Sequence, residues 1–311
     1  VQENKILVTG GSGMVGRALQ EIIPKAHFIS SGQYDLRDEP QCAAMFEKYN
    51  PQQVIHLAAR VGGVKANHSY LADFYTDNIL INTHVLKHAA KRNVDKLLSM
   101  LSTCVYPAST TYPLEEKNIH LGEPHWTNFS YAYAKRMLDV QSRAYRQQYG
   151  CNFITAIPNN MYGKHDNFDL EDSHVIPAMI RKMYEAKIHN QDVELWGDGS
   201  PIREFTCAKD IAYIILFLLK NYSGETPINI GNTDSLSIYN LAVTVKQIMG
   251  LKGNIKWNDS ELKGQHKKPS SNNKLLKLGF SPDTYTPIKV GLNEVCEWFK
   301  KTYPDIRGFK V

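Results

Sequence analysis

The stretch KILVTGGSGMVG, residues 5–16, decides the fold. Its first half is a short apolar run, typical of a strand that is covered on both faces. Its second half places Gly10, Gly13 and Gly16 three residues apart, directly after that strand and at the opening of a helix. Such glycines let the backbone approach a pyrophosphate at the positive end of a helix. The stretch predicts a dinucleotide-binding turn, and the alternative is a tight strand-to-helix turn without a ligand.

Similar apolar runs recur along the chain, separated by amphipathic segments of helical period. They are HFIS (27–30), QVIHLAA (53–59), KLLSMLS (96–102) and FITAIP (153–158). Short strands that alternate with helices build parallel sheets with helices on both faces. The sequence therefore predicts an α/β fold with a doubly wound parallel sheet of the Rossmann type.

The end of the second predicted strand indicates which dinucleotide is bound. An NAD enzyme places Asp or Glu there to bind the ribose 2′-hydroxyl. Here the chain reads Ser30, Ser31, Gly32, and the first acid is Asp35. A 2′-phosphate would meet hydroxyl groups and little repulsion, so NADP or NADPH is the favoured cofactor.

The regular alternation ends near residue 165, where Pro, Gly and Asn become frequent. We expect residues 1–165 to form an NADP-binding Rossmann domain, rejoined by about 207–235, which includes the apolar run IAYIILFLLK (211–220). Residues 166–311 should mainly form a smaller C-terminal α/β lobe that binds the substrate.

Composition excludes several classes of function. The chain has 311 residues, 42% of them hydrophobic, and a net charge of +5 without a run of Lys or Arg, so no nucleic-acid partner is expected. No stretch approaches the roughly 20 apolar residues of a membrane span, and the start VQENKILVTGG lacks an apolar signal segment. Five cysteines without close spacing suggest neither a disulfide framework nor a metal site. The expected location is cytoplasmic.

The catalytic signal lies in YAYAK, residues 131–135. Tyr131 and Lys135 are one helical turn apart, so both side chains leave the same face. The ammonium and an oxidised nicotinamide would favour the phenolate of Tyr131, which lets its hydroxyl exchange protons near neutral pH. Ser102 ends the fourth predicted strand, at the carboxyl edge of the sheet where ligands bind. The alternative for the pair alone is an aromatic anchor beside a solvated lysine.

A wider set of segments carries a resemblance. GGSGMVG, HLAARVGGV, LSTCVYP, YAYAK, NNMYGKHDNF, SHVIPAMI and WGDGSPIREF resemble the GDP-L-fucose synthases, a family of extended short-chain dehydrogenases/reductases, over nearly the whole chain. The resemblance implies a bifunctional, NADPH-dependent epimerase and oxidoreductase. Its substrate would be GDP-4-keto-6-deoxy-D-mannose, which is epimerised at C3 and C5 and then reduced at C4 to GDP-L-fucose. It also implies a homodimer formed by the helices near residues 71–92 and 130–149.

The resemblance also implies roles for individual residues. The catalytic residues would be Ser102, Cys104, Tyr131, Lys135 and His174. The cofactor would contact Gly10, Gly11, Ser12, Gly13, Met14, Val15, Gly16, Asp35, Leu36, Ala58, Ala59, Lys135, Pro158, Asn160, Met161 and His174. The substrate would contact Asn160, Val175, Lys182, Trp196, Arg203 and Lys268. The chain differs from the family pattern at Lys164, Cys207, Ala208 and Lys263.

The implied chemistry explains why a thiol lies two residues beyond the serine. Hydrogens on C3 and C5 are acidic because they flank the C4 ketone, and inversion removes a proton from one face and returns one to the other. Free thiol and imidazole groups have pKa values of about 8.5 and 6.5, close enough to neutrality for this work. Cys104 and His174 could approach the sugar from opposite sides. The alternatives are a buried thiol and a helix-capping or surface histidine.

Other functions of the same fold stay open at this point. A sugar-nucleotide 4-epimerase is one, and a 4,6-dehydratase is another, although the latter carries an Asp-Glu pair where Cys104 and Val105 stand. A non-enzymatic NADP-sensing protein is the third, although such proteins generally lose the tyrosine or the lysine.

Overall fold

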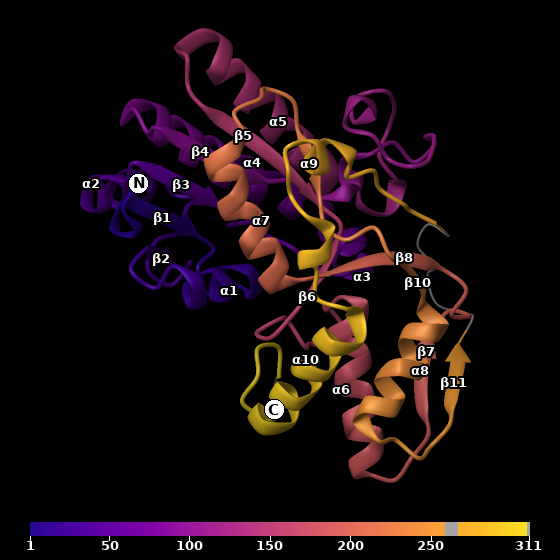
Figure 1. The fold of residues 1–311 in the computed structure, drawn as a ribbon. Coiled ribbons are helices and arrows are strands. Elements are labelled where there is room, and N and C mark those ends of the chain that lie inside the picture. The colour runs from indigo at the N-terminus through magenta and orange to yellow at the C-terminus, as the bar shows by residue number, and fades with distance from the viewer. Residues whose placement is uncertain (259–266, 310–311) are drawn as a thin grey trace.

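The structure is a computed structural model that describes residues 1–258 and 267–309. Its centre is a six-stranded parallel sheet with the strand order β2-β1-β3-β4-β5-β9 (Figure 1), so the predicted doubly wound sheet is confirmed. The strands of this sheet are β1 (Ile6–Thr9), β2 (His27–Ile29), β3 (Gln53–His56), β4 (Lys96–Met100), β5 (Phe153–Pro158) and β9 (Ile228–Ile230).

Helices cover both faces of this sheet because its strands are apolar on both sides. Ile6 and Val8 of β1 belong to one buried cluster and Leu7 to another, as the two-residue period of a strand requires. One face packs against α1 (Met14–Ile22) and α7 (Ala208–Asn221). The other packs against α2 (Glu39–Tyr49), α4 (Leu71–Lys91) and α5 (Phe129–Tyr149).

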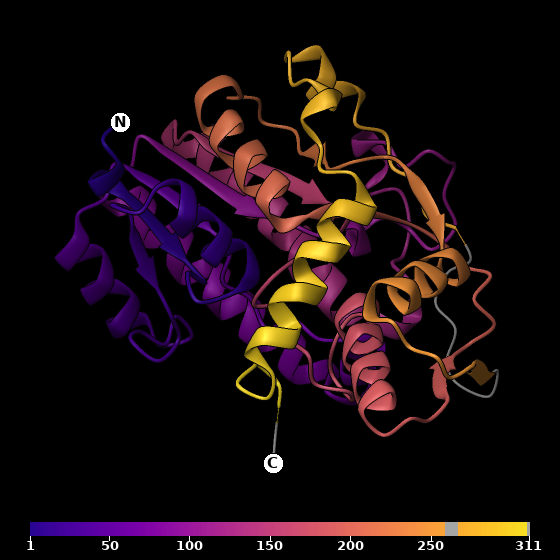
Figure 2. The ribbon, with the colours of Figure 1, turned by 60° about the horizontal axis from the view of Figure 1, so that its bottom comes forward.

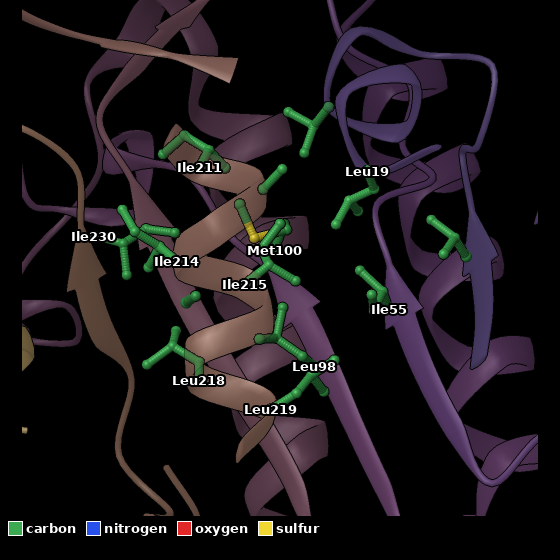
Figure 3. Close-up of a cluster of buried hydrophobic side chains, with 14 of the residues drawn as sticks. Leu19, Ile55, Leu98, Met100, Ile211, Ile214, Ile215, Leu218, Leu219 and Ile230 are labelled. Atoms are coloured by element: carbon green, nitrogen blue, oxygen red, sulfur yellow. The ribbon is translucent and has the colours of Figure 1, made fainter. Parts of the chain in front are cut away.

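Helix α7 shows how the apolar run at 211–220 is used. Figure 3 shows its inner side chains lying against the sheet, and they are Ile211, Ile214, Ile215, Leu218 and Leu219. In the part of the chain that the structure describes, no helix is both long enough and apolar enough to span a bilayer.

The second lobe lies beside the sheet lobe (Figure 2) and has its own buried core. It contains the three-stranded sheet β10-β8-β6 and the two-stranded sheet β11-β7. The strands are β6 (Asn160–Tyr162), β7 (Val193–Trp196), β8 (Ile202–Cys207), β10 (Ser235–Ser237) and β11 (Ile255–Asn258). The helices of its core are α6 (Val175–Ile188), α8 (Ile238–Met249) and α10 (Ile288–Thr302).

Short elements complete the described chain. They are α3 (Val64–Ser69), α9 (Asn273–Lys277) and the 3-10 helices Glu3–Lys5, Thr103–Val105, Glu116–Asn118, Trp126–Asn128 and Pro282–Thr284.

The topology indicates where a ligand should bind. Strands β2 and β3 lie on opposite sides of β1, so the chain changes direction between β1 and β3. In open α/β sheets, ligands bind at such a point, outside the carboxyl ends of the strands.

Candidate active site

A cleft of about 950 Å³ lies at that point, lined by residues of both lobes. It brings together most of the residues that the sequence singled out. Those on its walls are Gly10, Ser12, Gly13, Met14, Val15, Gly16, Asp35, Leu36, Ala58, Ala59, Ser102, Cys104, Tyr131, Pro158, Asn160, Met161, His174, Arg203 and Lys268.

The glycine turn after β1 fits a dinucleotide phosphate. Gly10 has φ +70°, and a Cβ on it would lie 2.8 Å from the backbone nitrogen of Ala58. A Cβ on Gly16 would lie 2.6 Å from the carbonyl oxygen of Gly10. Helix α1 begins after Gly13 with no side-chain cap and no acid in its first turn. Its first amide groups therefore suit an anion.

The adenosine end of the cleft contains an ion pair that sequence reasoning missed. Arg37 donates to Asp35 through Nη2 at 2.7 Å and through Nε at 2.9 Å. This hydrogen bonding lowers the pKa of Asp35. Ser30, Ser31 and Arg37 all line the cleft. The acid nearest the predicted ribose site is thus already paired with a cation.

Tyr131 and Lys135 leave one face of α5, as predicted. Tyr131 is 9% exposed and Lys135 is 3% exposed, and the Lys135 Nζ lies 5.9 Å from the tyrosine ring centroid. Nζ donates to the carbonyl oxygen of Met100 at 2.8 Å, which ties α5 to the end of β4. Burial lowers the pKa of Lys135 to about 8.

Burial also raises the pKa of the Tyr131 phenol, Cys104 raises it further, and a hydrogen bond with Ser102 lowers it. The predicted stabilisation of a phenolate by Lys135 and an oxidised nicotinamide concerns the enzyme with its cofactor, and burial acts against it. The neutral phenol is the favoured form.

Cys104 lies in the 3-10 helix that follows β4, beside Ser102 and Tyr131. Its backbone amide donates to Ser102 Oγ at 3.3 Å, and Asn128 Nδ2 donates to its sulfur at 3.0 Å. The thiol is half-buried and lines the cleft, so it is not a closed core cysteine. Asn128 comes from just before α5, and no pattern in the sequence predicts this contact.

His174 lies on the side of the cleft formed by the second lobe, where it precedes α6. It is exposed and makes no side-chain capping bond. Asp166 lies in the same cleft, is 7% exposed, and its Oδ2 has no hydrogen-bond partner among the described residues. Burial raises the pKa of Asp166, and the charge of His174 lowers it. Arg307, near the C-terminus, also reaches this cleft.

Some expected site residues do not line the cleft. Lys182 and Trp196 form a pair elsewhere in the second lobe, with the ammonium nitrogen 4.8 Å from the indole ring centroid. Gly11 packs closely against Phe28. The residues absent from the cleft walls are Gly11, Lys135, Val175, Lys182 and Trp196.

Three of the four positions that differ from the family pattern do not line the cleft. Cys207 and Ala208 are buried where β8 meets α7, and Lys164 is exposed. Lys263 lies outside the described residues.

The glycine turn and the Ser102, Tyr131 and Lys135 side chains at the edge of a parallel sheet define a nucleotide-dependent enzyme of the Rossmann type. Residues 6–231 match the sequence profile of the NAD dependent epimerase/dehydratase family. A GDP-L-fucose synthase from Dictyostelium discoideum is 43% identical to this chain, with 97% of each sequence covered. One from Escherichia coli is 30% identical, covering 99% of this chain and 100% of its own.

A solved structure agrees with these sequence matches. The crystal structure of a GDP-L-fucose synthetase from Naegleria fowleri bound to NADP has a TM-score of 0.91 and 38% identity, covering 99% of this chain and 96% of its own. The chain belongs to the NAD dependent epimerase/dehydratase family, and within it to the GDP-L-fucose synthases.

Proposed function

We propose that this protein converts GDP-4-keto-6-deoxy-D-mannose into GDP-L-fucose, by 3,5-epimerisation followed by NADPH-dependent reduction at C4. The observation that carries the proposal is the cleft itself. It holds a hydride-transfer set, Ser102 and Tyr131, together with Cys104 and His174, which a simple reductase does not need. The similarity to GDP-L-fucose synthases over the full chain supports the same activity.

In the epimerisation, Cys104 and His174 exchange protons with C3 and C5. Cys104 approaches from the sheet lobe and His174 from the second lobe, so the two groups can serve opposite faces of one sugar ring. Asn128 holds the sulfur in place through its hydrogen bond. Removal of either proton leaves negative charge on the C4 oxygen, and Ser102 and Tyr131 donate hydrogen bonds to that oxygen.

In the reduction, NADPH supplies the hydride and Tyr131 supplies the proton. The buried, neutral phenol is the form that can protonate the C4 oxygen. Ser102 polarises the ketone, and Lys135 is held by Met100 where it can contact the nicotinamide ribose. The same oxygen carries charge in both reactions, so the sugar can stay in one place.

The cofactor would lie on the sheet lobe. The turn from Gly10 to Gly16 would hold the pyrophosphate, because its glycines let the backbone pack closely and the first amide groups of α1 have no side-chain cap. Ser30 and Ser31 provide hydroxyl groups for a 2′-phosphate, and the pairing of Asp35 with Arg37 removes the repulsion of an isolated carboxylate.

The substrate would extend toward the second lobe. Arg203 and Lys268 lie in the cleft and suit the diphosphate, since a guanidinium can bind phosphate through two hydrogen bonds. Asn160 lies between these groups and the cofactor site. Lys182, Trp196 and Val175 lie outside the cleft walls, so they would contact only a nucleoside end that extends beyond the cleft.

Two further expectations belong to this proposal. Apolar side chains between α4 and α5 line a surface hollow, which would be the interface of a homodimer.

All five cysteines are free thiols, and we place the enzyme in the cytoplasm, where thiols stay reduced.

The test is to incubate the protein with GDP-4-keto-6-deoxy-D-mannose and NADPH and to identify the product by NMR. We expect GDP-L-fucose and one NADPH consumed for each sugar. A 4-epimerase would leave this ketosugar unreduced and would instead interconvert the C4 epimers of a GDP-hexose without net NADPH consumption. Recovery of the unchanged ketosugar would contradict the proposal.

A further inference from the structure

A buried carboxylate lies directly beside the proposed diphosphate site. Glu204 is the residue after Arg203 in β8 and is only 2% exposed. Successive side chains of a strand point to opposite faces, so Arg203 lines the cleft while Glu204 points away from it. A carboxylate that is buried this deeply needs partners to offset the loss of hydration.

The main partner of Glu204 is Ser270. The Ser270 amide donates to Oε1 at 3.0 Å and to Oε2 at 3.1 Å, and its hydroxyl donates to Oε2 at 2.5 Å. Asn159 Nδ2 adds a longer bond of 3.4 Å to Oε2. Hydrogen bonds to a buried carboxylate are stronger than those between neutral groups.

The rest of this segment is tied down by backbone contacts. Leu114 donates its amide to the carbonyl oxygen of Pro269 at 2.8 Å, and Ser271 donates to the carbonyl oxygen of Leu114 at 3.0 Å. Ile202 and Lys267 form a parallel bridge. Glu204 adds a buried ionisable side chain to these contacts, through its hydrogen bonds with Ser270.

Lys268 lies two residues before Ser270 and lines the cleft with Arg203 and Cys104. Burial lowers the pKa of its ammonium group, Cys104 raises it, and the charge of Arg203 lowers it. A lysine is a point charge on a flexible stem, so its position depends on the backbone that carries it.

We propose that Glu204 is a positioning residue, which fixes Ser270 and thereby holds Lys268 beside Arg203 against the diphosphate of a nucleotide sugar. This inference rests on the proposed function and adds to it the element that fixes the nucleotide-binding cation. Glu204 itself touches no ligand. Glu204 affects ligand binding only through the position of Lys268. A general role in stability would instead affect binding whether or not Lys268 is present.

A double-mutant cycle with GDP tests this. GDP contains the diphosphate, and its binding can be measured by calorimetry without turnover. Ser270→Ala removes the hydroxyl donor, and we expect it to weaken GDP binding about tenfold while NADPH binding stays within about twofold. In a Lys268→Ala background the same substitution should change GDP affinity less than about twofold, because its effect passes through the missing lysine.

Matched controls keep the test specific. Ser271→Ala changes the next side chain and should leave GDP affinity unchanged. Glu204→Gln keeps the volume of the side chain but replaces one of the two oxygens that accept from Ser270 with an NH2 donor, and we expect at least as large a loss as in Ser270→Ala. If Glu204→Gln does not fold, the double-mutant cycle of Ser270→Ala and Lys268→Ala is a sufficient test of the proposal.

The outcomes separate the two proposals. Equal losses from Ser270→Ala with and without Lys268 would overturn the positioning role, while GDP-L-fucose synthesis by the wild type would still stand. Wild-type protein that bound no GDP and formed no GDP-L-fucose would overturn both.

Discussion

At the scale of single residues, the site depends on how burial changes the ionisation of Tyr131 and Lys135, and on the access of the Cys104 thiol to the cleft. Tyr131 is kept neutral by burial, Lys135 is brought to a pKa of about 8, and Cys104 keeps one side open to the cleft. These are the properties of a proton donor, a cation that titrates near physiological pH, and an accessible thiol. The roles of Tyr131 and Lys135 can be tested separately.

Tyr131→Phe should abolish most of the reduction while leaving cofactor binding intact. The ring still packs, and only the proton donor is lost, so we expect kcat to fall about 10²- to 10⁴-fold. Tyr149→Phe, at the exposed end of α5 and outside the cleft, is the matched control. Turnover of Tyr131→Phe close to that of the wild type would remove Tyr131 from the mechanism.

Lys135 should set the alkaline limit of activity. Its pKa of about 8 means that the ammonium loses its proton as pH rises through that value. We expect kcat/KM for reduction to decline above about pH 8, because this profile reports the ionisation of the free enzyme. In Lys135→Arg the decline should move to higher pH, since a guanidinium stays charged. An unchanged alkaline limb in Lys135→Arg would show that another group is responsible.

At the scale of elements, the strand-to-helix connections carry the site, and buried polar side chains join the elements. His56 at the end of β3 lies 2.8 Å from Thr9 Oγ1 of β1 and 3.0 Å from Asn82 Oδ1 of α4. It is 2% exposed, and burial, followed by the charge of Lys135, lowers its pKa to about 3. The histidine is thus neutral in the folded protein.

This makes folding stability dependent on pH. An unfolded His56 takes up a proton below the ordinary histidine pKa of 6.5, whereas the folded one does so only near 3. Its contribution is full above pH 6.5 and is lost as pH falls toward 3. Between pH 7.5 and 5.0 the wild type should lose about 2 kcal/mol of unfolding free energy more than His56→Gln. Parallel losses in urea unfolding of the two proteins would contradict this.

Elements were also what the sequence predicted best. Local periodicity, which can be read from a sequence, predicted the apolar runs that form β1 to β5. It also predicted that Tyr131 and Lys135 lie on one face of a helix. The contacts of Asn128 with Cys104, and of Glu204 with Ser270, join residues 24 and 66 positions apart. No local pattern encodes such contacts. Arg37 was missed because an arginine beside an acid is ordinary on a surface.

At the scale of the whole molecule, two lobes meet at one cleft and one face remains apolar. The hollow between α4 and α5 is lined by Leu71, Ala72, Tyr75, Thr76, Phe129, Ser130, Tyr133 and Met137. Tyr75 is 42% exposed and Phe129 is 42% exposed, which suits an interface between two copies of the chain.

Light scattering tests this assembly. We expect twice the chain mass of 35.3 kDa for the wild type. Tyr75→Glu should give the mass of a single chain, because it places a charge in the buried centre of the interface. Tyr213→Glu changes a tyrosine of α7 that is 48% exposed and should stay dimeric. A wild type with the mass of one chain at micromolar concentration would refute the dimer.

The central claim is that one cleft performs both proton exchange and reduction, with Cys104 as a base. The most direct measurement is NMR of the product formed in deuterated water, from GDP-4-keto-6-deoxy-D-mannose and NADPH. The wild type and the control Cys151→Ser should place deuterium at C3 and C5. Cys104→Ser should place little at either carbon, because a hydroxyl is too weakly acidic to act as the base near neutral pH. Its slow product should retain the manno configuration, as GDP-rhamnose or its C4 epimer. Deuterium at both carbons at the wild-type level in Cys104→Ser would contradict the account.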